Sequence, residues 1–362
     1  MCDDHHARPG LHCILPPFIL TSIARNAPPE LRDRALRTLL IDPTIRIVRA
    51  TTGGPAAAGR LARLRQAAGN APAPRPSRTI YDAQGLPEAP GRAVARREGE
   101  PPTGDAAIDE AYDGLGATFD LFWEAYRRNS IDDAGQPLAA TVHFGEAYDN
   151  AFWDGAQMVF GDGDGVLFNR FTVALDIIGH ELAHGVIEKE AGLTYYGQPG
   201  ALNESISDVF GSLVKQRALG QTVTQADWLI GAGLFTARVR GRGIRSMSAP
   251  GSAYDDPVLG TDPQPGHMDD YVTTAQDNGG VHINSGIPNR AFHLAATAIG
   301  GEAWDGAGRI WYHALLDPAT RSNTEFLTFA RTTVDVAVRL HGPGGRQTVA
   351  VAEAWAAVGL AP

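Results

Sequence analysis

The sequence contains very little cysteine and almost no lysine. Cys2 and Cys13 are its only cysteines among 362 residues, and both lie near the N-terminus. No disulfide framework can therefore brace the rest of the chain, which must fold around an apolar core. Arginine supplies nearly all of the positive charge, with 29 arginines against two lysines. A GC-rich genome also produces such an excess, so it does not indicate a nucleic-acid partner.

The sequence also lacks a long uninterrupted apolar run. No segment approaches the roughly 18 apolar residues that a membrane-spanning helix needs, so we expect no membrane partner. The N-terminal residues lack the basic start, the apolar stretch and the small-residue cleavage site of a secretory signal. Localisation therefore stays open between the cytoplasm and export by an unrecognised route.

Charge is spread unevenly along the chain. The formal net charge is −10, yet residues 1–75 carry +6 and the remainder carries −16. The first segment is thus an electrostatic complement of the rest of the molecule. A hydrophobic content of 43% in a chain of this length supplies enough apolar material for two domains or one large bilobal one.

Composition divides the chain into four regions. Residues 1–50 contain a short amphipathic helical segment that follows a Pro-Pro pair. Residues 51–77 are rich in Ala, Gly, Pro and Arg, which predicts an exposed linker that contains a processing site. Residues 78–174 are predicted to form a β-rich lobe with one helix around 107–126. Residues 175–362 show helical periodicity, so the fold class is α+β.

The stretch IIGHELAHGVIE places two histidines and a glutamate inside an apolar helical run. Residues four apart on a helix project side by side, so His180 and His184 can chelate one zinc ion. Glu181 lies about 100° round the helix from His180, which suits a base acting on water rather than a ligand. A chance match or a surface charge cluster is the alternative, but unpaired charge would be costly in this apolar context.

The next predicted helix contains NESISD, which offers further ligands. A catalytic zinc needs a third protein ligand, and we expect Glu204 to supply it. Asp208, one turn later, would bond the non-ligating nitrogen of a histidine and fix its tautomer. The alternative is an ordinary helix start, in which Asn203 is the N-cap and Glu204 a first-turn acid.

Several motifs together resemble the thermolysin family of zinc metallopeptidases. They are HELAHGV, NESISDVFG, RSM and DNGGVHINSGIPN, in this order and spacing, and the resemblance covers residues 78–362. CILPPFIL is similar to the Pro-Pro-aromatic motif in the short propeptide of protealysin-like members. The resemblance implies a bilobal fold with the zinc helix between a β-rich and a helical lobe. It also implies a neutral zinc endopeptidase made as a self-inhibited precursor, with residues 1–50 as the propeptide.

The resemblance implies roles for individual residues. Zinc ligands match His180, His184 and Glu204, and Glu181 matches the glutamate that activates water. His282 and Tyr195 match the groups that stabilise the oxyanion, and Asp277 matches the carboxylate partner of His282. Asp208 and Asn203 would support the ligands from behind. The positions that match substrate-backbone contacts are Asn150, Ala151 and Arg245.

The resemblance also implies a preference for a bulky apolar residue just after the scissile bond. Five positions match the lining of the pocket for this residue, although each would serve equally well as ordinary core. They are Phe168, Phe171, Ile177, Ile230 and Ile244.

The sequence departs from the family at its paired calcium site. Asp176 and Asp227 match two of the acids that hold calcium there, but Lys215, Leu229 and Ala232 stand where three others would be. We therefore expect zinc as the cofactor and no calcium at this site. The ammonium group of Lys215 is predicted to replace the cation by pairing with both aspartates.

Two interpretations of the N-terminal segment stay open. In the first, Pro16, Pro17 and Phe18 lie in the substrate cleft, and the Cys13 thiolate coordinates zinc as part of an intramolecular inhibitor. In the second, the segment only assists folding, and Cys13 is a small buried hydrophobic residue. The predicted partners are protein or peptide substrates and the chain's own propeptide, and we expect a monomer.

The competing function is a non-catalytic zinc-containing protein that binds peptides. A purely structural zinc site closes with four protein ligands and has no use for a base or oxyanion donors. The chain retains Glu181, Tyr195, Asp277 and His282, and these residues favour the enzyme.

Overall fold

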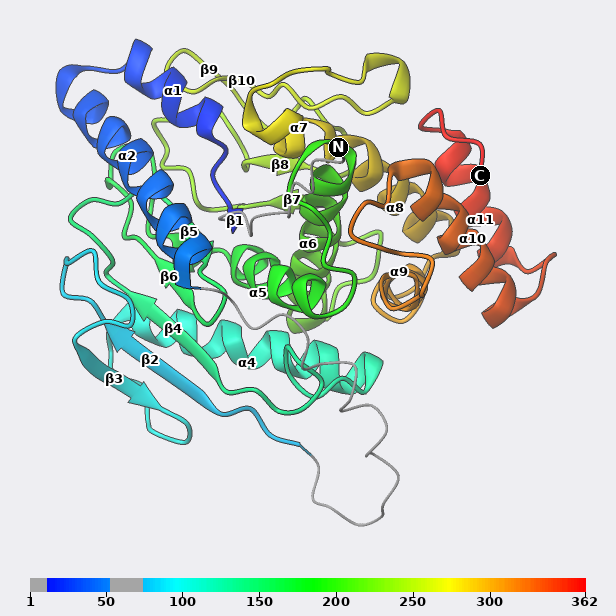
Figure 1. The fold of residues 1–362 in the computed structure, drawn as a ribbon, viewed down its shortest axis with the longest axis horizontal. Helices are drawn as coiled ribbons and strands as arrows, with labels where there is room; N and C mark the ends of the chain where they lie inside the picture. Colours follow the sequence, from blue (N-terminus) through cyan, green and yellow to red (C-terminus); the bar gives the residue numbers. More distant parts are fainter. Residues whose placement is uncertain (1–11, 53–73) are drawn as a thin grey trace, which may run out of the picture.

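The computed structural model describes residues 12–52 and 74–362. A β-rich half and a helical half pack against each other, and the helix that carries the HELAHGV motif lies between them (Figure 1). Within the described ranges, no helix combines the length and the apolar character needed to cross a membrane.

A six-stranded sheet forms the β-rich half, in the order β1-β5-β6-β4-β2-β3. Its central pairs, β2 with β4 and β4 with β6, are parallel, whereas the outer pairs are antiparallel. The strands are β1 (His12–Cys13), β2 (Arg78–Asp82), β3 (Ala93–Arg97), β4 (Leu138–Val142), β5 (Ala151–Trp153) and β6 (Met158–Phe160). The N-terminal segment thus contributes an edge strand to the sheet.

Three long helices build the centre of the molecule. Asp105 is the N-cap of α4 (Ala106–Tyr126), and its carboxylate accepts hydrogen bonds from the backbone amides of residues 107 and 108. α5 (Leu175–Lys189) and α6 (Gly197–Ala218) are buried along most of their lengths. A helix surrounded by protein needs apolar or paired residues on every side, which explains their weak amphipathic pattern.

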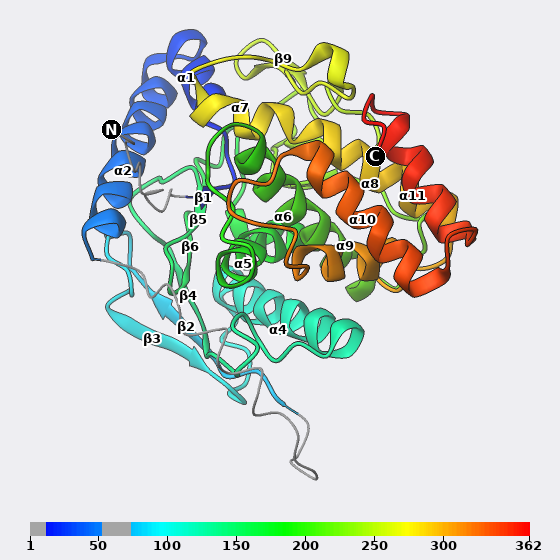
Figure 2. The ribbon, with the colours of Figure 1, turned by 45° about the vertical axis from the view of Figure 1, so that its right-hand side comes forward.

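The remaining helices complete the helical half (Figure 2). They are α7 (Asp277–Asn284), α8 (Gly286–Ile299), α9 (Ala307–Leu315), α10 (Phe326–His341) and α11 (Arg346–Ala356). Short strand pairs connect α6 to α7, namely β7 (Leu229–Ile230) with β8 (Arg245–Ser246) and β9 (Asp255–Asp256) with β10 (Gly260–Thr261).

Two N-terminal helices lie along one side of the molecule, beyond the edge of the sheet (Figures 1 and 2). α1 (Pro17–Asn26) and α2 (Pro29–Thr52) each begin with a proline, whose missing amide proton is not needed in a first turn. The sequence predicted only one short helix here. α2 extends two residues into the expected linker, and residues 53–73, where most of the predicted processing region falls, lie outside the described residues.

Candidate metal centre

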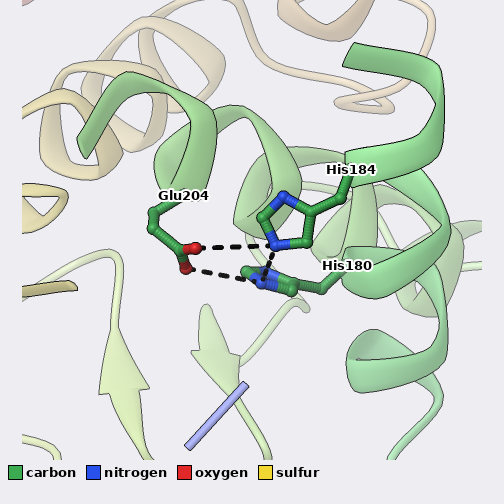
Figure 3. Close-up of side chains that lie close together, drawn as sticks. All are labelled: His180, His184 and Glu204. Atoms are coloured by element: carbon green, nitrogen blue, oxygen red, sulfur yellow. Dashed lines mark hydrogen bonds and ion pairs between the residues drawn. The ribbon is translucent and has the colours of Figure 1, made fainter. Parts of the chain in front are cut away.

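α5 presents His180 and His184 side by side, as their four-residue spacing predicts. Their Nε2 atoms lie 3.0 Å apart, and both side chains are buried. Glu204 reaches the same point from α6. Its Oε2 atom lies 3.5 Å from His180 Nε2, and its Oε1 atom lies 3.5 Å from His184 Nε2 (Figure 3). In the part of the chain that the structure describes, these residues form the one group of three or more His, Cys, Asp or Glu side chains that could hold a metal ion, with ligand atoms within 4.8 Å of one another.

The hydrogen-bond partners of the two histidines suit this group to a cation. His180 Nδ1 lies 2.7 Å from Asp208 Oδ1, and His184 Nδ1 lies 2.8 Å from Asn203 Oδ1. These acceptors favour a proton on each Nδ1, so both Nε2 atoms turn lone pairs toward one another. Glu204 Oε2 is buried without a hydrogen-bond donor. Two imidazole nitrogens and a carboxylate form a donor set that zinc binds readily.

Close packing of α5 on α6 brings the three ligand side chains together. A Cβ atom added to Gly211 would lie 2.3 Å from the carbonyl oxygen of Asp176 and 3.0 Å from the amide nitrogen of His180. A Cβ added to Gly179 would lie 3.0 Å from the Cα of Gly211. Any larger residue at these positions would push the helices apart and move Glu204 away from the histidines.

Asp208 connects the metal group to the rest of the site. Its carboxylate lies against His180 and accepts hydrogen bonds from Arg245 Nε and Nη2 at 2.8 Å and from Asn289 Nδ2 at 2.8 Å. Burial alone would raise the pKa of Asp208, but Arg245 and His180 hold it well below its usual range. Asn203 lies inside α6, which begins at Gly197, so it is not an N-cap and the alternative interpretation as a helix start is wrong.

Glu181 is fully buried beside the ligands and has one oxygen without a partner. Its Oε2 accepts a hydrogen bond of 3.0 Å from the backbone amide of Trp153, whereas its Oε1 has none. Burial and the neighbouring Glu204 raise the pKa of Glu181 well above its ordinary value. A carboxylate with a raised pKa and a free oxygen is suited to accepting a proton.

His282, Asp277 and Tyr195 meet on the other side of Glu204. His282 Nδ1 lies 2.6 Å from Asp277 Oδ1, and His282 Nε2 lies 3.3 Å from the Tyr195 hydroxyl. The Tyr195 hydroxyl donates to Glu204. Burial lowers the pKa of His282, but Asp277 and Glu204 more than offset this and raise it to about 9. His282 therefore carries a proton at neutral pH.

The backbone before His282 has an unusual course. Asp277, Asn278, Gly279 and Gly280 all have φ between 50° and 80°, in the left-handed region. Four such residues in a row reverse the chain tightly and allow Asp277 Oδ2 to accept a hydrogen bond from the His282 amide at 2.8 Å. The Gly-rich sequence therefore sets the geometry of this histidine-carboxylate pair.

The N-terminal segment lies against the predicted substrate-binding residues. Leu15 donates its amide proton to Asn150 Oδ1 at 3.0 Å, and Ile14 donates to the carbonyl oxygen of Ala151 at 3.1 Å. Arg245 Nη1 donates to the carbonyl oxygen of Ile14 at 3.1 Å. Asn150, Ala151 and Arg245 thus all contact the main chain of Ile14 and Leu15.

The segment makes its polar contacts with the site through Cys13, Ile14 and Leu15, of which only Cys13 was expected from the sequence. Pro16 and Pro17 form the start of α1, followed by Phe18, while the backbone of Cys13 to Leu15 makes the polar contacts. The Cys13 side chain packs in an apolar cluster with residues such as Phe152, and its sulfur is not part of the metal-ligand group. Ile14 and Leu15 were missed. Their one signal was an apolar pair just before Pro16, where extended backbone is favoured.

The remaining expected positions are those of the altered calcium site and the candidate pocket residues. Lys215 Nζ donates to Asp176 Oδ2 at 2.6 Å, Asp227 Oδ1 at 2.9 Å and the carbonyl oxygen of Leu229 at 2.7 Å, so the predicted pairing is confirmed. Ala232 lies just beyond β7. The five candidate pocket residues are at most 2% exposed and belong to the same hydrophobic cluster as Ile14. They are Phe168, Phe171, Ile177, Ile230 and Ile244.

Comparison with known proteins gives consistent matches. Residues 76–188 match the thermolysin metallopeptidase catalytic domain, and residues 191–360 match the alpha-helical domain of the same family. An extracellular metalloprotease of Pectobacterium carotovorum is 52% identical over 96% of both chains, and protease PrtS of a Photorhabdus strain is 46% identical over 96% of this chain and 91% of that one. The precursor of protealysin, a metalloproteinase from Serratia proteamaculans, is structurally similar with a TM-score of 0.86 and 51% identity, over 97% of this chain and all of that one.

Proposed function

The chain belongs to the thermolysin family of metalloproteases and shares its bilobal α+β fold, and we propose that it is a zinc endopeptidase blocked by its own N-terminal segment. The observation that carries this proposal is the meeting of three kinds of group at one buried point. A three-residue ligand set, a base with one oxygen free of hydrogen bonds and a histidine paired with a carboxylate lie next to one another.

His180, His184 and Glu204 are assigned to hold the zinc ion, with Asp208 and Asn203 fixing the histidine tautomers. When bound, zinc supplies Lewis acidity, which polarises a carbonyl group and lowers the pKa of water. Glu181 is placed to accept the proton of the attacking water and to pass it to the leaving nitrogen. The free Oε1 atom of Glu181 supports this role.

His282 and Tyr195 are assigned to stabilise the negative charge that develops on the carbonyl oxygen. Asp277 keeps the His282 ring oriented and protonated, and burial with Glu204 raises the pKa of Tyr195 so that its phenol keeps its proton. Donors held in place before the reaction need no reorganisation during it, and losing one typically costs ~2.7 to 4 kcal/mol of transition-state stabilisation.

The N-terminal segment is assigned as an intramolecular inhibitor. With the segment in place, the zinc ligands and Glu181 are at most 1% exposed, so a substrate has no access to them. Attachment to the same chain gives the segment a high effective concentration. We therefore propose residues 1–50 as the propeptide, 51–77 as the linker that is cut, and 78–174 and 175–362 as the two lobes of a monomeric enzyme.

The substrates are proposed to be proteins or peptides with a bulky apolar residue after the scissile bond. The burial of Ile14 beside Arg245 and Ala151 supports this preference. Two relatives bear the word extracellular in their names, and this supports export of the chain by a route that the sequence analysis did not recognise.

The test is to incubate the purified zinc-loaded precursor with casein and to follow trimming of its N-terminal region by mass spectrometry. The precursor should trim itself and then digest casein. Glu181→Gln should bind one zinc ion by elemental analysis, yet neither trim itself nor digest casein. Glu188→Gln, which removes the same charge from the same helix farther along, is the matched control and should behave like the parent. A parent that binds zinc and peptides but cuts neither itself nor casein would support the non-catalytic alternative.

A further inference from the structure

Four hydrogen bonds fix the direction and register of the N-terminal segment in the site. The carbonyl oxygen of Cys13 lies 3.0 Å from His282 Nε2. Ile14 then donates to Ala151 and accepts from Arg245, and Leu15 donates to Asn150. β1 runs antiparallel to β5, so the segment lies on the site as an added strand. An added strand is how an extended peptide substrate binds to an exposed sheet edge.

We propose that the peptide bond between Cys13 and Ile14 occupies the scissile position of the site in the direction of a true substrate, and that the precursor cuts itself there. This inference rests on the proposed function, because it uses the same groups. It adds a second processing bond, well before residues 51–77.

The carbonyl group of Cys13 lies beside the oxyanion donors. The site has one set of oxyanion donors, and His282 lies within hydrogen-bond distance of this oxygen. His282 Nε2 is also 3.5 Å from the ligand atom Glu204 Oε2 and 3.3 Å from the Tyr195 hydroxyl. The Cys13 carbonyl therefore points at the junction of the ligands and the donors, where the reacting carbonyl of a substrate must lie.

Ile14 and Leu15, the residues that follow Cys13, are bound through both their side chains and their main chain. Ile14 and Leu15 are both completely buried, whereas a chain that merely covered the site would leave side chains exposed. Their main-chain groups are matched by three different partners, Ala151, Arg245 and Asn150. Three main-chain hydrogen bonds and the burial of both side chains are expected for a productively bound substrate, with Ile14 directly after the bond to be cut.

The reaction is an ordinary hydrolysis. One water molecule adds across the bond, so that its oxygen joins the carbonyl carbon of Cys13 while the carbon-nitrogen bond breaks. A proton passes to the nitrogen of Ile14, leaving a carboxylate on Cys13 and an α-amino group on Ile14. Glu181 is the residue that carries the proton.

Both ends of the cut bond would stay in place, which explains how the precursor remains inhibited. β1 pairs with β5 on one side of the bond. On the other side, α1 buries Ile19, Leu20 and Ile23, and Ser22 Oγ donates to the carbonyl oxygen of Val258 at 2.9 Å. Ends held this close re-form the bond at a rate that competes with their release. Cut and intact segments are therefore expected to coexist on the same folded molecule.

The first experiment measures the cut. Zinc-loaded precursor is held at neutral pH, quenched in acid and analysed by mass spectrometry under denaturing conditions. We expect a peptide ending at Cys13 and a partner beginning at Ile14, which stay together in native gel filtration. Ile14→Leu should keep the cut, Ile14→Asp should reduce it at least about tenfold because the buried position rejects charge, and Glu181→Gln should abolish it.

The second experiment needs no catalysis. The chain has two cysteines, so carbonyl-labelled cysteine gives two carbon-13 signals, and Cys2→Ser assigns the signal of Cys13. Loading full-length Glu181→Gln with cobalt, a paramagnetic substitute for zinc, should strongly broaden or shift the Cys13 carbonyl signal.

These outcomes separate the two proposals. A protein that trims itself within residues 51–77 and digests casein, but shows no cut at Cys13 and no cobalt effect on its carbonyl, would overturn this inference and leave the proposed function standing. A cut at a neighbouring bond would overturn the register. Failure to hydrolyse any peptide bond would overturn both.

Discussion

The carboxylate of Asp208 connects three of the elements that build the site. It contacts His180, Arg245 and Asn289, which come from α5, β8 and α8. We expect Asp208→Asn to reduce zinc affinity by about 10 to 100-fold, because an amide supports the histidine tautomer poorly. Competition with a chromophoric chelator measures the affinity. Asp335→Asn, an exposed change on α10, is the control, and equal affinity in both variants would contradict the role of Asp208.

Asp149 is a buried acid beneath the N-terminal helices. It is 3% exposed, its Oδ1 has no hydrogen-bond partner, and its backbone amide donates to Thr38 Oγ1 on α2 at 3.3 Å. Burial, helped by Asp164 and opposed by Arg34, raises its pKa to about 7. The docked state therefore favours the protonated carboxyl, while a solvent-exposed Asp149 would ionise near its ordinary value of 3.8.

Because burial raises the pKa of Asp149, docking of α2 should depend on pH. Docking of α2 should be strongest below about pH 4 and should weaken by up to about tenfold per pH unit as the pH rises toward 7. Hydrogen-exchange protection of the α2 amides in full-length Glu181→Gln measures the docking, and protection should be lower at pH 8 than at pH 5. Asp149→Asn should remove most of this difference, and an unchanged difference would disprove the assignment.

At the scale of elements, Lys215 ties three parts of the chain together. Its ammonium group on α6 bonds Asp176 on α5 and the carbonyl oxygen of Leu229 on β7, while Asp176 also accepts from Gly231. Burial opposes the charge of Lys215, but Asp176 and Asp227 more than offset this and raise its pKa. Lys215→Met should therefore destabilise the protein by about 3 to 5 kcal/mol, because Asp176 would be left buried without an opposite charge.

Calorimetry measures this loss as a lowered melting temperature. The control is Lys189→Met, which changes the chain's other lysine, at the partly exposed end of α5, and should have little effect. Added calcium should leave the melting temperature of the parent unchanged, since the ammonium group already fills this position. A calcium-dependent rise of several degrees would contradict the replacement.

The long elements were largely predictable from the sequence. α4 follows the helix predicted around residues 107–126, α5 contains the predicted helical run IIGHELAHGVIE, and β2 begins at the predicted boundary at residue 78. α1 was missed because its Ile and Thr residues are poor helix formers, and its apolar face is buried only through packing against the rest of the protein. α6 begins at Gly197, ahead of the NESISD motif that was predicted to lie on a helix.

The site was predictable where its chemistry depends on local spacing. His180, Glu181 and His184 share one helix, and Glu204 and Asp208 share the next, so helical spacing aligned the side chains within each helix, while the packing of α5 on α6 joins the two sets. Ile14 and Leu15 contact groups more than a hundred residues away, and no local pattern encodes such contacts. Trp153 lies only 28 residues before Glu181, but its amide reaches Glu181 through the packing of β5 on α5, which no local pattern encodes either.

At the scale of the whole molecule, the core does not depend on the metal. Hydrophobic residues from both halves form one continuous cluster. Removing zinc with EDTA should therefore abolish casein digestion while circular dichroism shows the secondary structure retained. Zinc should restore activity, and calcium alone should not. Unfolding on chelation, or recovery with calcium alone, would contradict this expectation.

The position of β1 has a consequence for the processed enzyme. Once the segment departs, β5 becomes the border of its sheet, and its backbone amides and carbonyls face solvent without a neighbour. A polypeptide that is locally extended can pair with this row of groups as an added strand. The liberated enzyme should therefore attack denatured or loosely folded proteins in preference to compact ones, and concentrated stocks without substrate should tend to self-associate.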